Sequence, residues 1–219
     1  MPYVVENGDT VYLSPLKPAR VYQKLPRKKG REWRKYYRLV YNFAKVYPYA
    51  LVAGDIVDGA DSVIRARNLK YVAKDRYVTA LIAELFDSFE QPMRNLTVTQ
   101  GGLLMRLVDR QCGITSYNII KEFKNGYAAG FWQGVAKLFG SDLKRPYDPK
   151  GEDAPVEELI RQWEDGSFEK TYFEIFWDYP PMVEVPEKYS RPDLNTPHAR
   201  KEAPKQKSKK GTKKSSSKS

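Results

Sequence analysis

The sequence predicts a mainly α fold, a compact helical domain of about six or seven helices with a small N-terminal β hairpin. Apolar residues recur at steps of three and four along residues 32–47, 75–89 and 103–108, which is the spacing of one helix face. Capping residues and glycines punctuate these runs, as they do at the ends of helices. The hairpin is predicted because Asn7-Gly8 lies between two short β-prone runs.

The expected helices follow one another from residue 32 onward. Pro48 is expected to interrupt or kink the first of them, because proline donates no backbone hydrogen bond and clashes with the preceding turn. The Thr97/Thr99 pair is expected to set up the helix that carries Leu103 and Leu107, and Gly113 is expected to end it. The expected segments are 32–47, part of 55–74, 75–89, 97–112, 116–123, 126–140 and 154–163, of which the last is expected to be the final regular helix.

The chain is expected to divide into four parts. Residues 1–30 form the hairpin and a basic arm, and residues 31–166 form the helical core domain. Residues 167–185 are rich in aromatic and acidic side chains and are expected to form a strap. Residues 186–219 are rich in Lys, Ser and Pro, a composition that cannot bury a core, so we expect a disordered tail.

The net charge of +11 is spread unevenly along the chain. Residues 186–219 hold 11 Lys and Arg against 3 acids, whereas residues 1–185 hold 27 against 24. Within the latter, residues 17–45 carry a net charge of +10 and residues 148–184 one of −8. The simplest interpretation is two solvated faces of opposite sign, and the alternatives are that they dock on each other or bind partners.

Charged residues at helical spacing stand within residues 94–149. Asp109 follows Arg106 by three residues, so we expect the two to pair on one helix and to leave Arg110 for another partner. One interpretation is an ion-pair network that ties this helix to the acidic segment. The alternative is a site for a carboxylate or another anion, which arginine binds through two parallel hydrogen bonds. The candidate binding residues are Gln100, Arg106, Asp109, Arg110, Trp132 and Gln133.

The residue types present argue against several kinds of catalysis. His198 is the only histidine and lies in the predicted tail, which disfavours Ser-His-Asp and Cys-His machinery and a His-rich zinc site. Cys112 is the only cysteine and has no identifiable base, so a packing role is expected. The Asp series from Asp55 to Asp61 lacks the spacing of a calcium loop. We therefore expect no cofactor, no metal and a noncatalytic protein, with an enzyme that uses carboxylates as an alternative.

The expected partner is another protein, in an interaction or structural role. The alternative is a nucleic-acid-associated protein that uses the basic arm and tail. The tail lysines that would meet an anionic surface or nucleic acid are Lys205, Lys207, Lys209, Lys210, Lys213 and Lys214. No run of the sequence is long and apolar enough to predict a transmembrane segment, and the N-terminus has no export signal, so a cytoplasmic location is expected from the sequence as written.

A set of short motifs in this sequence resembles a known bacterial family. The motifs are Arg94–Gly101 (RNLTVTQG), Arg106–Arg110 (RLVDR), Thr115–Tyr117 (TSY), Phe131–Gly134 (FWQG) and Tyr147–Pro149 (YDP), together with Asn7–Thr10 and Tyr41–Ala50. In this order, over residues 6–158, they resemble an uncharacterised domain of unknown function found mainly in Bacteroidetes. The resemblance implies no particular activity. Because similar proteins usually begin with an export signal, it implies a cell-envelope or periplasmic location if the start of the chain is truncated.

Overall fold

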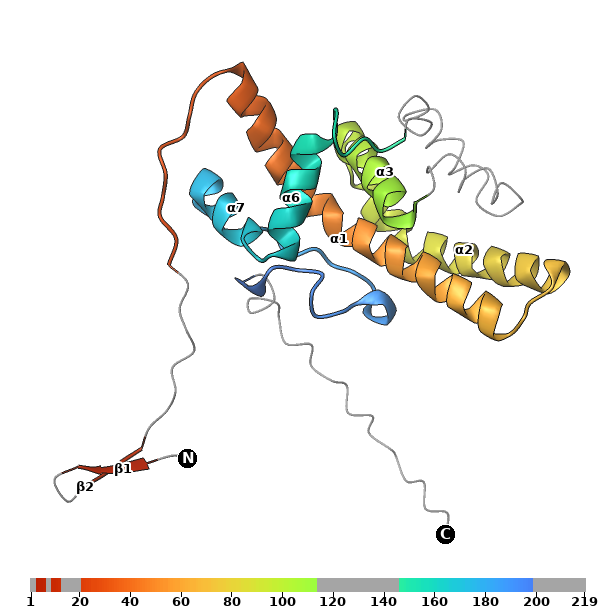
Figure 1. The fold of residues 1–219 in the computed structure, drawn as a ribbon, viewed down its shortest axis with the longest axis horizontal. Coiled ribbons are helices and arrows are strands. Elements are labelled where there is room, and N and C mark those ends of the chain that lie inside the picture. Colours follow the sequence, from red (N-terminus) through yellow and green to blue (C-terminus); the bar gives the residue numbers. More distant parts are fainter. Residues whose placement is uncertain (1–2, 7–8, 13–20, 114–145, 199–219) are drawn as a thin grey trace, which may run out of the picture.

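The computed structural model describes residues 3–6, 9–12, 21–113 and 146–198 (Figure 1). These residues form five α-helices and one short 3-10 helix, so the prediction of a mainly α fold is confirmed. The helices are α1 (Arg31–Ala66), α2 (Tyr71–Arg94), α3 (Val98–Cys112), α6 (Ala154–Glu164), α7 (Phe168–Phe176) and the 3-10 helix η2 (Glu187–Tyr189). The helices predicted at 116–123 and 126–140 lie outside the described residues.

Two short strands precede the helices. Strand β1 (Tyr3–Glu6) and strand β2 (Asp9–Tyr12) are antiparallel, with Tyr3 opposite Tyr12 and Glu6 opposite Asp9. Residues 7 and 8, which carry the turn signal, lie outside the described residues. The hairpin turn therefore stays a prediction.

The longest described helix, α1, runs without a break through Pro48, so an interruption there is wrong, and the alternative of a kink stays a prediction. A proline inside a helix costs about 3 kcal/mol because one hydrogen bond is lost and the ring crowds the preceding turn. Val40 and Phe43 are fully buried and Tyr47 is 1% exposed. Burial stabilises each such side chain by about 1.5–3 kcal/mol, which together outweighs the cost of the proline. The separate helix predicted within 55–74 is replaced by the end of α1 and the start of α2.

Local residues determine both ends of α3, as the sequence predicted. The Thr97 hydroxyl accepts the Gln100 N–H, and the Gln100 side chain accepts the Thr97 N–H, which together make a capping box. Gly113 follows the helix with a φ of 66°, a left-handed conformation that glycine adopts without strain. These bonds position the polar side chains that α3 presents to its neighbours.

The hydrophobic core lies where α1 meets α3, α6 and α7. Figure 1 shows α6 near the middle of α1, with α7 and α3 to its two sides. Gly54 of α1 lies close to Gln111 of α3, since a Cβ built on this glycine would stand 3.4 Å from the Gln111 Cβ. The buried apolar residues of this core are Val40, Phe43, Ala44, Val46, Tyr47, Ala50, Leu103, Leu104, Leu107, Val156, Leu159, Ile160, Phe168 and Tyr172.

Residues 168–176 form a regular helix, α7, so the prediction of a strap without a further helix is wrong here. Phe168 and Tyr172 are 1% and 4% exposed, and Ile175 and Phe176 pack against the core. These four residues stand at i, i+4, i+7 and i+8, which places them on one helix face. The aromatic residues of this segment therefore extend the core.

Residues 186–198 pack against the helices, so the predicted disorder is wrong for this part of the tail. Leu194 is 1% exposed. The Asn195 side chain accepts the Val183 N–H at 2.7 Å and donates to the Val183 carbonyl at 3.1 Å. The segment is therefore held by individual contacts of this kind. Its sequence has no apolar run that would do the same. Residues 199–219 lie outside the described residues.

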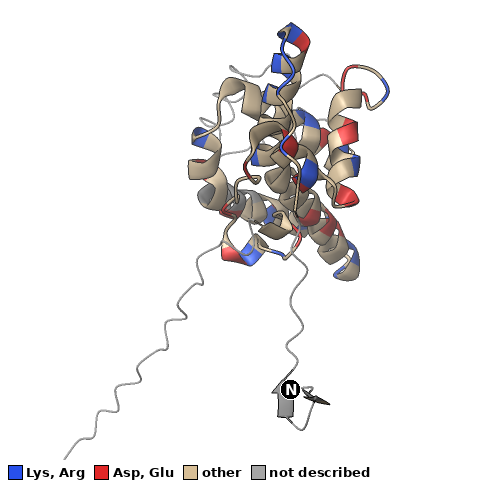
Figure 2. Cartoon of the chain, turned by 90° about the vertical axis from the view of Figure 1, so that its left-hand side faces the viewer, with Lys and Arg blue, Asp and Glu red and all other residues tan. Residues whose placement is uncertain are grey.

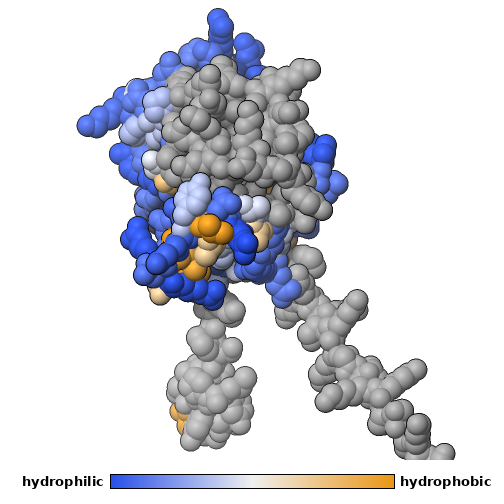
Figure 3. Space-filling model, turned by 90° about the vertical axis from the view of Figure 1, so that its right-hand side faces the viewer, coloured by the Kyte–Doolittle hydropathy of each residue, from blue (hydrophilic) through white to orange (hydrophobic). Residues whose placement is uncertain are grey.

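The described surface is mostly hydrophilic. Figure 3 views the end of the molecule where α1 and α2 meet, and a small apolar group interrupts the polar side chains there. Tyr71 and Val72, at the start of α2, are 87% and 61% exposed. Among the helices of the described residues, none has the length and the apolar composition that a membrane span requires.

Candidate functional site

Gln100 is a predicted binding residue that lies buried at the start of α3. It is 6% exposed, as is Asn42 of α1. The Gln100 side-chain oxygen accepts the Thr97 N–H at 3.0 Å, and its nitrogen donates to the Asn42 side-chain oxygen at 3.2 Å. Both ends of the amide are thus used inside the fold, where they tie α3 to α1.

Arg106 and Asp109 do not pair with each other, so the predicted pair on one helix is wrong. Arg106 forms an ion pair with Asp153, just before α6. Asp153 is fully buried, and its second oxygen accepts the Asp148 N–H at 3.0 Å. Asp109 accepts the Tyr147 N–H at 2.6 Å. The chain that returns to α3 after residue 145 therefore supplies closer and more buried partners than the helix itself.

Arg110 faces α6 and meets two of its carboxylates. It lies 3.0 Å from Glu157 and 3.7 Å from Glu164. Glu157 also accepts the Tyr147 hydroxyl at 2.9 Å. Burial opposes the ionisation of Glu157, but the hydrogen bonds from Arg110 and Tyr147 outweigh it and lower the pKa of Glu157. Burial and the hydrogen bond to Glu157 raise the pKa of the Tyr147 phenol.

These contacts join α3 to the start of α6, and we call Arg106, Arg110, Asp153 and Glu157 the α3–α6 clamp. The two arginines and the two carboxylates balance each other in charge. An anionic ligand at Arg106 would have to displace Asp153, which has no exposed surface. The clamp agrees with the interpretation of an ion-pair network between this helix and the acidic segment. Two further candidate residues, Trp132 and Gln133, lie outside the described residues.

Other reactive side chains are also used or shielded. Burial, together with the charges of Asp58 and Asp109, raises the pKa of the Cys112 thiol to about 11, the opposite of what a nucleophile needs. Asp55 pairs with Arg191 at 2.5 Å. Throughout the described ranges, no group of three or more His, Cys, Asp or Glu side chains is arranged to hold a metal ion.

A strongly basic surface covers the arm before α1 and the first turns of that helix. Between residues 24 and 38 the chain has eight Lys and Arg residues, all exposed, and one acid, Glu32. Figure 2 shows Lys and Arg at the top of the molecule, where the arm leads into the start of α1. We call this the basic arm surface, and it comprises Lys24, Arg27, Lys28, Lys29, Arg31, Arg34, Lys35 and Arg38.

The arm is held against α7 and the residue that follows it. The Trp177 indole donates to the Leu25 carbonyl at 3.1 Å, and the Arg27 guanidinium donates to the Ile175 carbonyl at 3.3 Å. The Lys24 ammonium and the Arg27 guanidinium lie 5.8 and 5.4 Å from the centre of the Trp177 ring, within reach of a cation–π attraction. The basic arm and the acidic, aromatic segment therefore dock on each other, which was one of the predicted alternatives, but through hydrogen bonds to backbone carbonyls and cation–π contacts.

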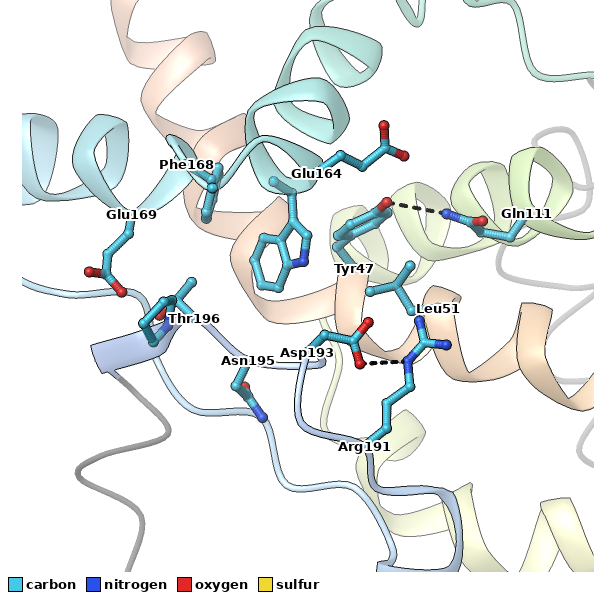
Figure 4. A pocket seen from close by; sticks show the side chains of 13 residues that line it. Tyr47, Leu51, Gln111, Glu164, Phe168, Glu169, Arg191, Asp193, Asn195 and Thr196 are labelled. Atoms are coloured by element: carbon cyan, nitrogen blue, oxygen red, sulfur yellow. Dashed lines mark hydrogen bonds and ion pairs between the residues drawn. The ribbon is translucent and has the colours of Figure 1, made fainter.

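A pocket of about 430 Å³ lies where α1, α3, α6, α7 and residues 191–197 meet (Figure 4). Tyr47, Trp163 and Phe168 give it aromatic walls, and Glu169 and Arg191 are among its charged residues. Burial chiefly raises the pKa of the Tyr47 phenol, to about 12. Sequence reasoning missed this pocket because its residues come from five separate segments and no local pattern links them.

The family model of a domain of unknown function, DUF4294, matches residues 9–162. The chain belongs to the DUF4294 family. The DUF4294 region contains the α3–α6 clamp and the basic arm surface, and it ends inside α6. Helix α7 and residues 177–198, which supply much of the pocket lining, lie beyond the DUF4294 match. No curated protein and no solved structure matches the chain at a significant level.

Proposed function

We propose that this DUF4294 protein is a noncatalytic interaction protein that binds an acidic protein partner through the basic arm surface. The observation that carries the proposal is a cluster of exposed positive charges on a segment held in place by α7. Because the arm is already ordered, a partner does not have to supply the full cost of ordering it.

The charges of this surface are mostly uncompensated. Lys35 pairs with Glu32 at 3.0 Å. Lys29, Arg31 and Arg34 are exposed and form no ion pair with any described residue, and the same holds for Arg38. Such a field raises the association rate of an oppositely charged partner and selects against basic ones.

The aromatic residues of the surface favour a protein over a single-stranded nucleic acid. The Lys28 ammonium lies 4.3 Å from the centre of the Trp33 ring. Trp33 also contacts Tyr36 and Tyr37, with ring centres 6.0 Å away in each case. Proteins that bind single strands usually stack bases on open ring faces. These rings already contact a cation and one another, so they offer fewer open faces for bases. Nucleic acid is therefore the second candidate.

Two matched variants of the full chain test the proposal. The first replaces Lys29, Arg31, Arg34 and Arg38 by Gln, and the control replaces Arg67, Lys70, Lys74 and Arg76, four exposed basic residues near the start of α2, by Gln. Neither set has side-chain ion pairs within the described residues, so both variants should fold. Fluorescence anisotropy measures binding to a labelled acidic peptide and to a labelled single-stranded oligonucleotide over a range of salt concentrations.

The proposal predicts that the first variant loses affinity for the acidic peptide and that the control does not. At about 0.5 kcal/mol for each exposed charge, four charges correspond to about 2 kcal/mol, or about thirtyfold. Equal losses in both variants would mean attraction to net charge alone and would contradict a defined surface. Tight oligonucleotide binding that weakens steeply with salt, without peptide binding, would favour the second candidate.

The remaining parts of the molecule have supporting roles in this proposal. Gln100, Arg106, Asp109 and Arg110 keep the helices in register, and no cofactor or metal takes part. The complete domain has six or seven helices and an N-terminal hairpin, and its helical part reaches to the end of α7.

A further inference from the structure

The pocket between α1, α6, α7 and residues 191–197 has no part in the proposed function, and its charged residues do not balance. Three acids line it, Glu164, Glu169 and Asp193, against a single lining base, Arg191. Glu164 is paired from outside the lining by Arg110, at 3.7 Å. Arg191 is already engaged, since it pairs with Asp193 at 3.0 Å and with Asp55 at 2.5 Å. The pocket is therefore electronegative, which favours a cation.

Glu169 is the acid whose charge is least compensated. It is 3% exposed. Its two oxygens accept the Tyr22 hydroxyl at 3.1 Å and the His198 backbone N–H at 2.9 Å, and both donors are neutral. Within the described residues Glu169 forms no ion pair with a Lys, Arg or His side chain. Since a buried charge without a countercharge costs several kcal/mol, a cation in the adjoining pocket is bound favourably.

Thr196 provides a second, independent sign of a ligand. It lines the pocket and is 7% exposed, and its hydroxyl has no hydrogen-bond partner among the described residues. Figure 4 shows Thr196 close to Glu169. Buried hydroxyls are nearly always hydrogen-bonded, and a threonine hydroxyl rotates about its Cα–Cβ bond to accept a donor from a ligand.

Aromatic rings and one aliphatic side chain complete the wall. The Trp163 and Phe168 ring centres are 5.2 Å apart, and Trp163 lies 5.4 Å from the Tyr47 ring. Ring faces attract cations, and together with Leu51 they give a hydrocarbon chain an apolar contact. The volume of about 430 Å³ is at the small end of the range for ligand pockets.

We propose that this pocket binds a primary ammonium group on a short hydrocarbon stem, as in a lysine side chain. The Glu169 carboxylate supplies the countercharge, the Thr196 hydroxyl accepts one N–H, and Trp163 and Phe168 contact the stem. Two sources carry this group. One is the chain itself, whose lysines after residue 199 directly follow the segment that lines the pocket, and the other is an amine or a lysine of another molecule.

The test uses the full chain labelled with nitrogen-15 and two probes of equal length, n-pentylammonium and 1-pentanol. The indole N–H signal of Trp163, assigned with Trp163→Phe, reports binding in an NMR titration. The charged probe is expected to shift this signal and the neutral probe to leave it in place. Glu169→Gln, which is nearly isosteric, is expected to weaken pentylammonium binding about tenfold, the loss of a charge-assisted hydrogen bond.

Two further variants separate a ligand role from a structural one. Glu174→Gln removes the same charge from α7 at a position outside the pocket and is expected to leave pentylammonium binding unchanged. Thr196→Val is expected to weaken binding while the melting temperature stays the same or rises, because the hydroxyl has no partner to lose. Equal binding of the two probes, or unweakened binding by Glu169→Gln, would overturn the proposal.

A third arm identifies the source of the ammonium group. In a full chain whose lysines after residue 199 are replaced by Gln, pentylammonium binds more tightly than in the wild type if those lysines occupy the pocket. It binds with the same affinity if the natural ligand comes from another molecule.

Discussion

The α3–α6 clamp is predicted to stabilise the fold, and Arg106→Met tests this most sharply. Met keeps most of the apolar stem and removes the charge, which leaves Asp153 fully buried with the Asp148 N–H as its remaining bond. Removing one partner of a buried pair costs about 3–5 kcal/mol. The Arg106 side chain is 24% exposed, which places the expected loss at the low end, about 3 kcal/mol.

Urea unfolding followed by tryptophan fluorescence and circular dichroism measures this loss. For a chain of this length, about 3 kcal/mol lowers the melting temperature by about 6–12 °C. The matched control is Arg161→Met, because Arg161 pairs with Glu158 on the surface of α6 and its side chain is 64% exposed. The control should change the free energy of unfolding by less than about 0.5 kcal/mol. Equal effects of the two substitutions would refute the reasoning, and so would stabilisation by Arg106→Met, which is the result expected if Arg106 awaited an anionic ligand.

Three smaller predictions follow from the same region. Thr97→Ala removes the α3 cap and should lower the free energy of unfolding by about 1 kcal/mol, whereas Thr99→Ala, in the same turn but with no part in the cap bonds, should not. The pKa of Glu157 is lowered in the folded state. Its ionised carboxylate therefore adds fully to the free energy of unfolding above its unfolded pKa of about 4.3, and this contribution is lost as the pH falls through its pKa in the folded state. The stability difference between wild type and Glu157→Gln, measured by urea unfolding, should therefore be constant near neutral pH and shrink in acid. The pKa of about 11 for Cys112 predicts slow reaction with a thiol reagent at mildly alkaline pH in the native protein and fast reaction in urea.

Each of these predictions has an outcome that contradicts it. Equal stabilities of the two threonine variants would mean that the capping box contributes nothing. A stability difference between wild type and Glu157→Gln that grows in acid would mean that the pKa of Glu157 is raised, not lowered, in the folded state. Native Cys112 that reacts as fast as in urea would show an accessible, activated thiol.

Features determined by neighbours in the chain were predictable from the sequence. Thr97 and Gly113 mark the two ends of α3. The Thr97 side chain and the Gly113 backbone each act within one helical turn. Helix α7 was predictable in principle from the spacing of Phe168, Tyr172 and Phe176, but the acidic residues between them obscured it. Pro48 misled the prediction because its local cost is outweighed by burial that only the tertiary fold provides.

The candidate site was only partly predictable, because its partners are distant in sequence. The rule that residues three apart pair on a helix predicted Arg106 with Asp109, but Arg106 pairs with a residue 47 positions away. The interpretation of an ion-pair network to the acidic segment was correct, because it follows from charge alone. The Glu169 and Thr196 pocket had no sequence signal, since neither residue type nor spacing indicates that five segments meet there.

Photo-crosslinking in native cells is the most direct test of the claim that the basic arm surface binds a protein. A photoreactive residue placed at Arg34 of the full chain, or at Arg76 as a control that is also exposed, reports which molecule touches each surface. The proposal predicts that position 34 captures a protein rich in Asp and Glu, that added salt reduces the capture, and that position 76 captures none of it. Equal capture from both positions, or capture of nucleic acid alone at position 34, would contradict it.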